Sequence, residues 1–500
     1  MFKLNKDVLF LIFEELQDNK KFLYSCLRVN KTWCETIVPI LWKYPTGKYS
    51  EPSKTAPGFW INNDDNYLSK YQKNVLFYVI LLHLSEESRN YLENRGFKLF
   101  GEEYREPSFN YIRFWRHLNL HILEIMLNFV KIDDKSIVRE EILKLFVNRN
   151  TKFISLTISS LFDPQKCHIP GANQCLSELE SFYCNDNSNE KALEQLSKIC
   201  HKIKRIRLII IKQHSINSRI VKLIKAQRNL NDVQLICRNY NDYQSSLRYR
   251  ETLEETLIKN ANTIRYLRIS WLPITNILSC FVNLINLDIE AIVDSKTNWI
   301  NLKNVVSLPY LKVLKANQIP LKLLTNIIES TKGYLTEISI LNIRDDKKYI
   351  LQKITQYCPN LKYLKILLMS NFFLELENLL LNCKNLQGLV FLINGFGESC
   401  WDNLFKILIE SSPINLFKFK FRSDFISLNV DFLESFFDNW KDRPPMFLHF
   451  DTNNNNHSRN LELQRQRRKK IKNLGNLYKK KGIIKHCLHN DTLLGDFEWI

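Results

Sequence analysis

The sequence has little glycine and proline and no long apolar run, and each shortage excludes a class of protein. Only 12 glycines and 14 prolines occur among 500 residues, too few for a collagen-like or Gly/Pro-rich disordered chain. The longest clean apolar stretch, Val75–Leu82, is far short of the roughly 20 residues that cross a bilayer. The apolar run Val8–Phe13 is ended by Glu14 and Glu15 without a cleavage site, so we expect no signal peptide and a location in the cytoplasm or nucleus.

The cysteines and histidines form no recognisable catalytic or metal-binding motif. None of the twelve cysteines belongs to a C-x-x-C pair, and Cys200, Cys358 and Cys383 each precede a large aliphatic residue by three positions, which is typical of a small buried side chain. We expect twelve free thiols in a reducing compartment. His117 and His121 stand four apart on an expected helix, but no third metal ligand is evident. We therefore expect no enzyme activity, no catalytic residue, no bound metal and no cofactor.

Acidic residues are outnumbered 52 to 71 by lysine and arginine, and much of the excess lies near the C-terminus. Between Arg459 and Lys485 there are 11 basic residues and one acid, Glu462, so this segment supplies +10 of the formal net charge of +19. Such a segment either attracts acidic partners or nucleic acid, or is a solvated helix face. Arg465–Lys470 also fits a nuclear import signal.

A repeat occupies the C-terminal two thirds of the chain. One aliphatic residue, two spacers, a second aliphatic residue, one spacer and a third recur with a mean period of about 26 residues, within the 20–29 range of leucine-rich repeats. The motif is loose around Leu176-Leu179, and the steps after Leu230 (34 residues) and Ile264 (20 residues) are irregular. Its clearest copies are Phe153-Leu156-Ile158, Ile203-Ile206-Leu208, Leu230-Val233-Leu235, Ile264-Leu267-Ile269, Leu284-Leu287-Ile289, Leu311-Leu314-Ala316, Leu335-Ile338-Ile340, Leu361-Leu364-Ile366, Leu386-Leu389-Phe391 and Leu416-Phe419-Phe421.

This pattern predicts an α/β fold of stacked parallel strands. The second and third positions lie two apart and so share one face of a strand. Between the strands, apolar residues at helical spacing, such as Leu323, Leu324, Ile327 and Ile328, predict a helix in each repeat. Each strand–helix repeat buries its apolar face only against its neighbours. We expect a leucine-rich-repeat solenoid over residues 151–458, with the strands on the concave face and the helices outside.

The basic segment 459–500 is expected to cap this solenoid. A helix fits Leu461–Lys481, Gly482 is placed to end it, and Ile483–Leu488 fits a final edge strand. The apolar stripe of this helix consists of Ile471, Leu474 and Tyr478. A polar terminal helix keeps the end of a solenoid soluble.

The first forty residues predict three short helices. One apolar face of the first helix, at the i, i+3, i+4, i+7 spacing, is formed by Leu9, Ile12, Phe13 and Leu16. Asn5 is the expected N-cap of this helix. A second helix fits Phe22–Val29 and a third fits Lys31–Val38, which Pro39 is expected to end. Three helices of this size bury little surface alone and usually need a partner.

A set of spaced residues in this segment follows a known pattern. The residues are Leu4, Asp7, Val8-Leu9, Ile12-Phe13, Leu16, Val29, Lys31, Trp33 and Leu41-Trp42. In type and spacing they resemble the F-box. Asn5 stands where the F-box pattern has proline, and Asn30 stands where it has cysteine. An F-box followed by leucine-rich repeats is itself a familiar family arrangement.

The resemblance implies a substrate-recognition subunit of a cullin-type (SCF-type) ubiquitin ligase. The F-box, residues 1–45, would bind a Skp-family adaptor and through it a cullin, and the repeats would hold a substrate protein. Residues 46–150 would form a helical connector, with helices near 74–84, 86–94 and 112–130. The adaptor-facing surface would comprise Leu4, Leu9, Ile12, Phe13, Leu16, Val29 and Trp33.

The spacer residues in and beside the strands are the candidate substrate surface. On a concave sheet face they would be exposed, and their basic members would favour an acidic or phosphorylated substrate. These basic members are Arg205, Arg207, Arg265, Arg268, Lys362, Lys365, Lys418 and Lys420.

Two other functions stay open. One is a repeat-based scaffold whose F-box-like segment no longer binds the adaptor. The other is a basic nucleic-acid-associated protein, whose affinity would fall steeply with salt. We expect protein partners rather than nucleic acid, and no membrane partner.

Overall fold

The structure is a computed structural model that describes most of the chain. The described residues are 4–46, 68–97, 104–128, 135–158, 171–211, 218–237, 247–291, 306–341, 347–393, 396–423, 429–452 and 461–489. They fall into two compact units, the first ending at Asn260 and the second beginning at Ala261.

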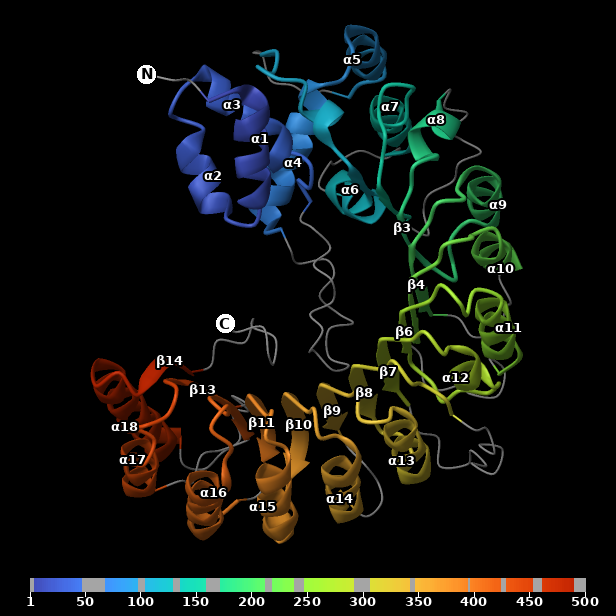
Figure 1. The fold of residues 1–500 in the computed structure, drawn as a ribbon. Helices are drawn as coiled ribbons and strands as arrows, with labels where there is room; N and C mark the ends of the chain where they lie inside the picture. The colour runs from blue at the N-terminus through green and yellow to red at the C-terminus, as the bar shows by residue number, and fades with distance from the viewer. Residues whose placement is uncertain are drawn as a thin grey trace. The chain divides into compact units, whose positions relative to one another are not determined.

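The first unit opens with a three-helix bundle (Figure 1). Its helices are α1 (Lys6–Glu15), α2 (Lys20–Cys26) and α3 (Lys31–Leu41). They lie at the three predicted positions, although α2 begins and ends earlier than expected. The helix α3 continues past Pro39, where the sequence predicts its end. Pro39 lies in the last turn, where its missing N–H removes a single intrahelical hydrogen bond, and the buried Ile40 holds that turn in the bundle core.

A helical segment with one short strand follows the bundle. Its elements are α4 (Lys70–Leu82), α5 (Glu86–Glu93), the 3₁₀ helix η2 (Tyr111–Phe114), β1 (His117–Asn119), α6 (Leu120–Leu127) and α7 (Lys135–Phe146). The single helix expected over 112–130 is therefore wrong. Leu118 on β1 pairs with Leu156 on the next strand, so the sheet begins before the first copy of the sequence repeat. A three-residue strand is too short for periodicity to distinguish it from a helix.

The sheet of the first unit consists of parallel strands in chain order. After β1 come β2 (Ser155–Thr157), β3 (Ser181–Asn185), β4 (Arg205–Ile210) and β5 (Asp232–Cys237). The helices that accompany them are α8 (Ala172–Leu176), α9 (Glu190–Ile199), α10 (Ser218–Lys225) and α11 (Leu247–Ile258). Each strand pairs in parallel with the next one along the chain.

The second unit repeats the same arrangement. Its strands are β6 (Tyr266–Ile269), β7 (Asn286–Glu290), β8 (Val313–Asn317), β9 (Glu337–Leu341), β10 (Tyr363–Leu368), β11 (Gly388–Ile393), β12 (Lys418–Ser423), β13 (Met446–Thr452) and β14 (Ile484–His489). Its helices are α12 (Ile277–Cys280), α13 (Leu321–Ser330), α14 (Lys347–Tyr357), η5 (Ser370–Phe372), α15 (Phe373–Asn382), α16 (Glu398–Ser411), α17 (Val430–Asp438) and α18 (Leu461–Lys480). The strands again pair in parallel and in chain order, and helices α13 to α16 lie along one side of the strand row (Figure 1). The predicted α/β class is confirmed.

The strand register follows the sequence repeat. The second position of the motif on one strand pairs with the second position on the next: Leu364 of β10 pairs with Leu389 of β11, which pairs with Phe419 of β12. All three side chains are fully buried. Because identical positions stack across the sheet, each repeat completes the core of its neighbour.

The loose copy of the motif is displaced by three residues from its predicted position. Phe182 pairs with Leu156 on one side and with Ile206 on the other, which makes it the second position of this repeat. The first and third positions are then Leu179 and Cys184, both buried. A phenylalanine and a cysteine at aliphatic positions hid this register from the sequence pattern.

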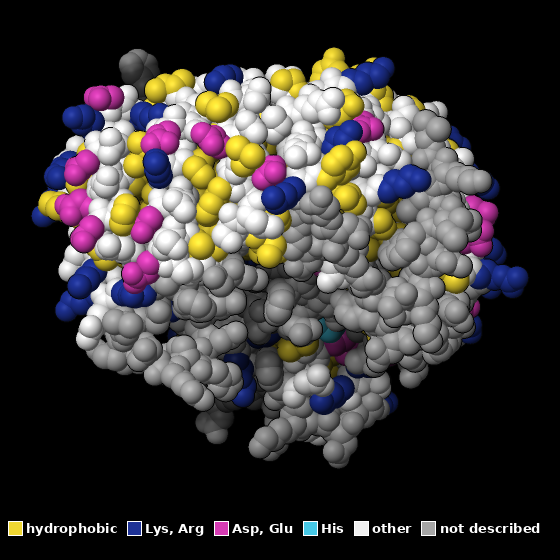
Figure 2. Space-filling view, turned by 90° about the horizontal axis from the view of Figure 1, so that it is seen from below, with side chains coloured by type: hydrophobic (Ala, Val, Ile, Leu, Met, Phe, Trp, Pro, Cys, Tyr) yellow, Lys and Arg dark blue, Asp and Glu magenta, His cyan; other side chains and the backbone are white. Residues whose placement is uncertain are grey.

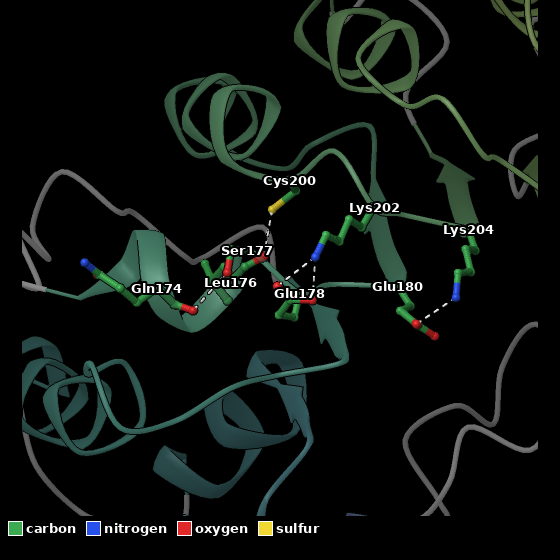
Figure 3. A network of polar contacts seen from close by, with 8 residues as sticks. All are labelled: Gln174, Leu176, Ser177, Glu178, Glu180, Cys200, Lys202 and Lys204. Atoms are coloured by element: carbon green, nitrogen blue, oxygen red, sulfur yellow. Dashed lines mark hydrogen bonds and ion pairs between the residues drawn. The ribbon is translucent and has the colours of Figure 1, made fainter.

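Contacts one repeat apart tie neighbouring repeats of the first unit together (Figure 3). Lys202 and Lys204 form ion pairs with Glu178 and Glu180, each 24 residues earlier, with Nζ to carboxylate distances of 2.8 Å. The thiol of Cys200 donates to the carbonyl oxygen of Leu176, also 24 residues earlier, over 3.3 Å. The ion pairs are exposed and therefore add little stability. The buried thiol contact connects the two repeats inside the core.

The cysteines at the repeating position are buried thiols, as predicted. Cys200, Cys358 and Cys383 have no exposed surface, and all eleven cysteines in the described ranges are free. The Cys383 thiol donates to the carbonyl oxygen of Cys358 over 3.7 Å. Burial raises the pKa of Cys200 and Cys358 to about 12 and that of Cys383 to about 11. These thiols stay protonated at neutral pH and act as small apolar side chains.

The buried thiols predict a loss of stability at alkaline pH. Their pKa values lie above the ordinary value of 9.0, so the unfolded chain releases these protons first as the pH rises. The protonated thiols therefore contribute fully to the stability of the folded state below pH 9, and this contribution is lost between about pH 9 and 12. We expect the urea midpoint to fall between pH 8 and 10.5 under reducing conditions. The fall should be smaller in the triple variant Cys200→Ala, Cys358→Ala, Cys383→Ala, and equal falls would contradict the assignment.

The surface formed by helices α13 to α16 carries both positive and negative charges. Viewed from the side of α13 to α16, Lys and Arg side chains are interspersed with Asp and Glu and with hydrophobic groups (Figure 2). Leu374 and Leu381 of α15 and Ile414 after α16 are exposed apolar side chains. Among the described residues, no helix combines the length and the apolar character that a membrane span needs.

Candidate functional site

The three-helix bundle has a small core of its own. Its buried members are Leu9, Phe13, Leu23, Cys26, Ile37 and Ile40, and the half-buried Leu16, Leu27, Trp33 and Leu41 pack against them. The rings of Phe13 and Trp33 meet edge to face at 5.1 Å between centroids. Ion pairs between Lys6 and Glu35 and between Lys43 and Glu14 connect α1 to α3 and to the residues after it. The bundle is therefore held together from within.

An asparagine caps each helix of the bundle. The side-chain oxygen of Asn5 accepts from the N–H of Asp7, that of Asn19 from Phe22, and that of Asn30 from Trp33 at 2.9 Å. Each cap is worth about 1 kcal/mol compared with alanine. Asn5 and Asn30 are the two positions where the chain departs from the F-box pattern, and capping gives both departures a local structural role.

The bundle separates the predicted adaptor-facing residues into two groups. Leu9 and Phe13 are only 4% and 2% exposed, so they do not face outward as predicted. They fill the bundle core because α2 and α3 pack on that side of α1. Leu4, Ile12 and Val29 are exposed and remain available to a partner. The half-buried Leu16 and Trp33 contribute mainly to packing.

The sequence pattern did not predict a second apolar side of α1. Leu4, which precedes the N-cap Asn5, and Val8, Leu11 and Ile12 of α1 are exposed at the helical spacing i, i+4, i+7, i+8. They are here named the exposed stripe, and Leu11 is 63% exposed. This stripe lies on the side of α1 away from Leu9. Its spacing is as helical as that of the core face, so periodicity alone predicts two apolar faces and does not tell which is buried.

Ring contacts attach the bundle to the following segment of the same unit. Trp42, just after α3, lies 4.4 Å from the ring of Tyr111 in η2, and Tyr44 lies 4.0 Å from His117 on β1. The N–H of Arg116 donates to the carbonyl oxygen of Lys43. These contacts join the bundle to the start of the sheet of the first unit.

The predicted substrate-facing residues are only partly exposed. Arg265 and Lys362 lie just before β6 and β10 and are exposed, while Arg205 and Arg207 on β4 are half-buried. The other four are buried, contrary to their predicted exposure: Arg268, Lys365, Lys418 and Lys420. The two exposed residues precede their strands, whereas the four buried ones lie within β6, β10 and β12.

Arg268 is buried because it has acidic neighbours. It lies opposite Asp288 of the adjacent strand, and Glu290 is two residues further along that strand on the same face. Its guanidinium lies 3.5 Å from the Asp288 carboxylate and 3.6 Å from that of Glu290. Burial lowers the pKa of Arg268, but the two carboxylates outweigh this effect and raise it overall. Arg268 is thus a structural ion-pair residue.

Three buried lysines and a histidine gather on one face of β10 to β13. Lys365 lies opposite Val390, which lies opposite Lys420, which lies opposite His449. Lys418 precedes Lys420 by two residues and shares its face. We name Lys365, Lys418, Lys420 and His449 the basic strand cluster; each is 3% exposed or less. Because strands are about 4.8 Å apart, the Cα atoms of Lys365 and Lys420 are about 10 Å apart.

A glycine allows a tyrosine to reach this cluster. Gly388 lies between Tyr363 and Lys418 in the strand register, and a Cβ at this glycine would lie 2.8 Å from the Tyr363 ring. The ring occupies that space, and Lys418 Nζ donates to its hydroxyl over 3.0 Å. The sequence pattern missed Tyr363 and His449, although His449 stands between two apolar residues, Leu448 and Phe450, as a strand spacer does.

The described residues contain no group of three or more His, Cys, Asp or Glu side chains placed to hold a metal ion. His117 lies on strand β1 and His121 on α6, so the helical pair expected from the sequence is wrong. Compared with known proteins, the chain matches no protein-family model and no curated protein.

Proposed function

We propose that this chain is a substrate-recognition subunit of an SCF-type ubiquitin ligase. The three-helix bundle would bind a Skp-family adaptor, and the strand–helix repeats, as leucine-rich repeats, would hold the substrate. The observation that carries this proposal is the exposed stripe on α1. Val8, Leu11 and Ile12, with Leu4 just before the helix, offer apolar surface beside a helix face that already fills a core. Such a surface on a small bundle favours a protein partner.

The adaptor surface that we propose differs from the one expected from the sequence. It consists of the exposed stripe together with Val29, which is also exposed. Leu9 and Phe13 would support this surface from below without touching the adaptor. The aromatic contacts of Trp42 and Tyr44 would hold the bundle against the sheet of the first unit.

Capture of a purified Skp-family adaptor by the full chain tests this proposal. The double variant Leu11→Ala, Ile12→Ala should weaken adaptor binding about thirtyfold or more, since truncating interface anchors costs about 2–4 kcal/mol. Both side chains are exposed, so the fold should be unaffected. The control is Tyr71→Ser on α4, which removes a 77% exposed side chain outside the bundle and should leave binding unchanged.

The outcome discriminates between the two protein-binding functions. If the unaltered chain fails to bind the adaptor at moderate salt, the ligase assignment is wrong and the repeat-based scaffold is favoured. If the chain binds but the double variant binds equally well, the exposed stripe is not the adaptor surface.

For the substrate, we propose an acidic or phosphorylated segment that contacts the exposed Arg265 and Lys362 beside the strands of the second unit. The same full-length protein can be titrated with phosphopeptides in place of the adaptor. Lys362→Met, which removes an exposed lysine just before β10, should lower their affinity, while Lys322→Met, which removes an exposed lysine on α13, should not. Equal affinities for phosphorylated and unphosphorylated peptides would contradict this part of the proposal.

A further inference from the structure

The last helix of the second unit has one buried side. In α18, Ile471 and Tyr478 are fully buried, and the Tyr478 hydroxyl donates to Asp438 of α17 over 2.6 Å. Gly475, on the same side, lies so close to β14 that a Cβ there would be 2.7 Å from the Cys487 Sγ. The buried side of α18 is therefore used in packing the helix on α17 and β14.

The exposed surface of α18, centred opposite its buried side, carries five lysines. We name Lys469, Lys470, Lys472, Lys479 and Lys480 the basic face; all five are exposed. Lys469 and Lys480 are eleven residues apart, three helical turns, and so point to the same side about 16 Å apart along the axis. No aspartate or glutamate occurs between Leu463 and Lys485. The basic face is a rigid strip of charge, because the buried side fixes the helix.

These lysines are not used to hold the fold together. Within the ranges that the structure describes, none of the five forms an ion pair, whereas Arg467 on the same helix pairs with Glu398 at 2.8 Å. Neighbouring lysines contact rings instead: Lys481 lies 4.1 Å from the Tyr478 ring centroid. Like charges this close repel one another, so an extended anion would be stabilised along the basic face.

We propose that the basic face of α18 binds the phosphate backbone of a nucleic acid. Lysine is a point charge that contacts phosphates without a fixed geometry, and a strip about 16 Å long spans several phosphates along a strand. Between the two groups of lysines lie only Asn473, Asn476 and Leu477 on this side. Binding is therefore electrostatic and shows little dependence on base sequence. This function is independent of adaptor binding.

Other anionic partners fit this surface less well. Protein interfaces are depleted in lysine and depend on buried aromatic or apolar anchors, and the basic face offers only the half-exposed Leu477. A helix that lies in a membrane inserts an apolar side, and here that side is packed on α17 and β14. A phosphate backbone needs neither an anchor nor insertion.

Fluorescence anisotropy with labelled single-stranded and duplex oligonucleotides, using the full chain, tests this proposal. The triple variant Lys469→Gln, Lys472→Gln, Lys480→Gln should bind at least tenfold more weakly at 100 mM salt. The slope of log affinity against log salt should become shallower by about 2 to 3, because three phosphate contacts are lost. Glutamine preserves helix propensity, and an unchanged circular dichroism spectrum and melting temperature would verify the fold.

A matched control removes the same charge elsewhere in the second unit. Lys322→Gln, Lys384→Gln, Lys406→Gln replaces three exposed lysines on or beside other helices and should change the affinity and slope little. An equal loss in this control would show that net charge alone is responsible and would overturn the proposal. So would unchanged binding by the basic-face variant. Binding to phosphatidylserine vesicles or to an acidic protein, without binding to oligonucleotides, would overturn it in favour of that partner.

Discussion

Replacing Phe13 with alanine is expected to unfold the N-terminal three-helix bundle. Phe13 is one of six buried residues in that core and meets Trp33 edge to face. Truncating a buried phenylalanine costs about 3–5 kcal/mol, which exceeds what so small a core can lose. In the full chain, the amide hydrogens of α1, α2 and α3 should exchange about a hundredfold faster or more. Hydrogen-exchange mass spectrometry measures this directly.

The neighbouring residue provides the control for Phe13. Ile12 is 42% exposed, so Ile12→Ala removes a similar apolar side chain from the other side of the same helix. It should leave the exchange rates of the bundle almost unchanged while weakening adaptor binding. A protected bundle in Phe13→Ala would contradict the packing described above. A bundle that unfolds in Ile12→Ala would mean that the exposed stripe is part of the core.

Replacing Arg268 with methionine is expected to destabilise the second unit by about 2–3 kcal/mol. The substitution leaves Asp288 and Glu290 on one face of β7, both mostly buried and without their common counter-ion. Removing one member of a buried ion-pair group leaves an uncompensated charge, which costs more than the group contributes when complete. The urea midpoint of the second unit should fall, with faster amide exchange in β6 and β7.

Two further variants separate charge from packing at Arg268. Arg265→Met removes an exposed arginine three residues earlier. It should change the free energy of unfolding by less than about 0.5 kcal/mol. Adding Asp288→Asn and Glu290→Gln to Arg268→Met removes the unpaired charges and should restore much of the loss. If this triple variant is no more stable than Arg268→Met alone, the cost comes from packing, and the electrostatic explanation is wrong.

The repeat was predictable because it rests on short-range geometry. A strand places residues two apart on the same face, and the spacing of Leu364 and Ile366, repeated in Leu389 and Phe391, reports this alternation directly. The helices followed from apolar residues at helical spacing, as in α13. Where the pattern used other residue types, as in Phe182 and Cys184, the prediction lost the register.

The candidate site was less predictable than the fold. From the sequence, Leu9 and Leu11 of α1 are equivalent apolar residues, and only the packing of α2 and α3 decides that Leu9 is buried and Leu11 exposed. The same holds for lysines near the strands. Lys362 and Lys365 are three residues apart, yet the first is exposed before β10 and the second is buried within it.

The sequence by itself determined the α/β class, the period of the strand–helix repeats and the buried state of the repeating cysteines, because each depends on contacts within a repeat or with its neighbour. Only the tertiary structure decided which side of α1 is free, that Arg268 belongs to an ion-pair group, and that Lys365, Lys420 and His449 share one row. These features depend on residues brought together from different helices and strands, and local spacing carries no information about such distant neighbours.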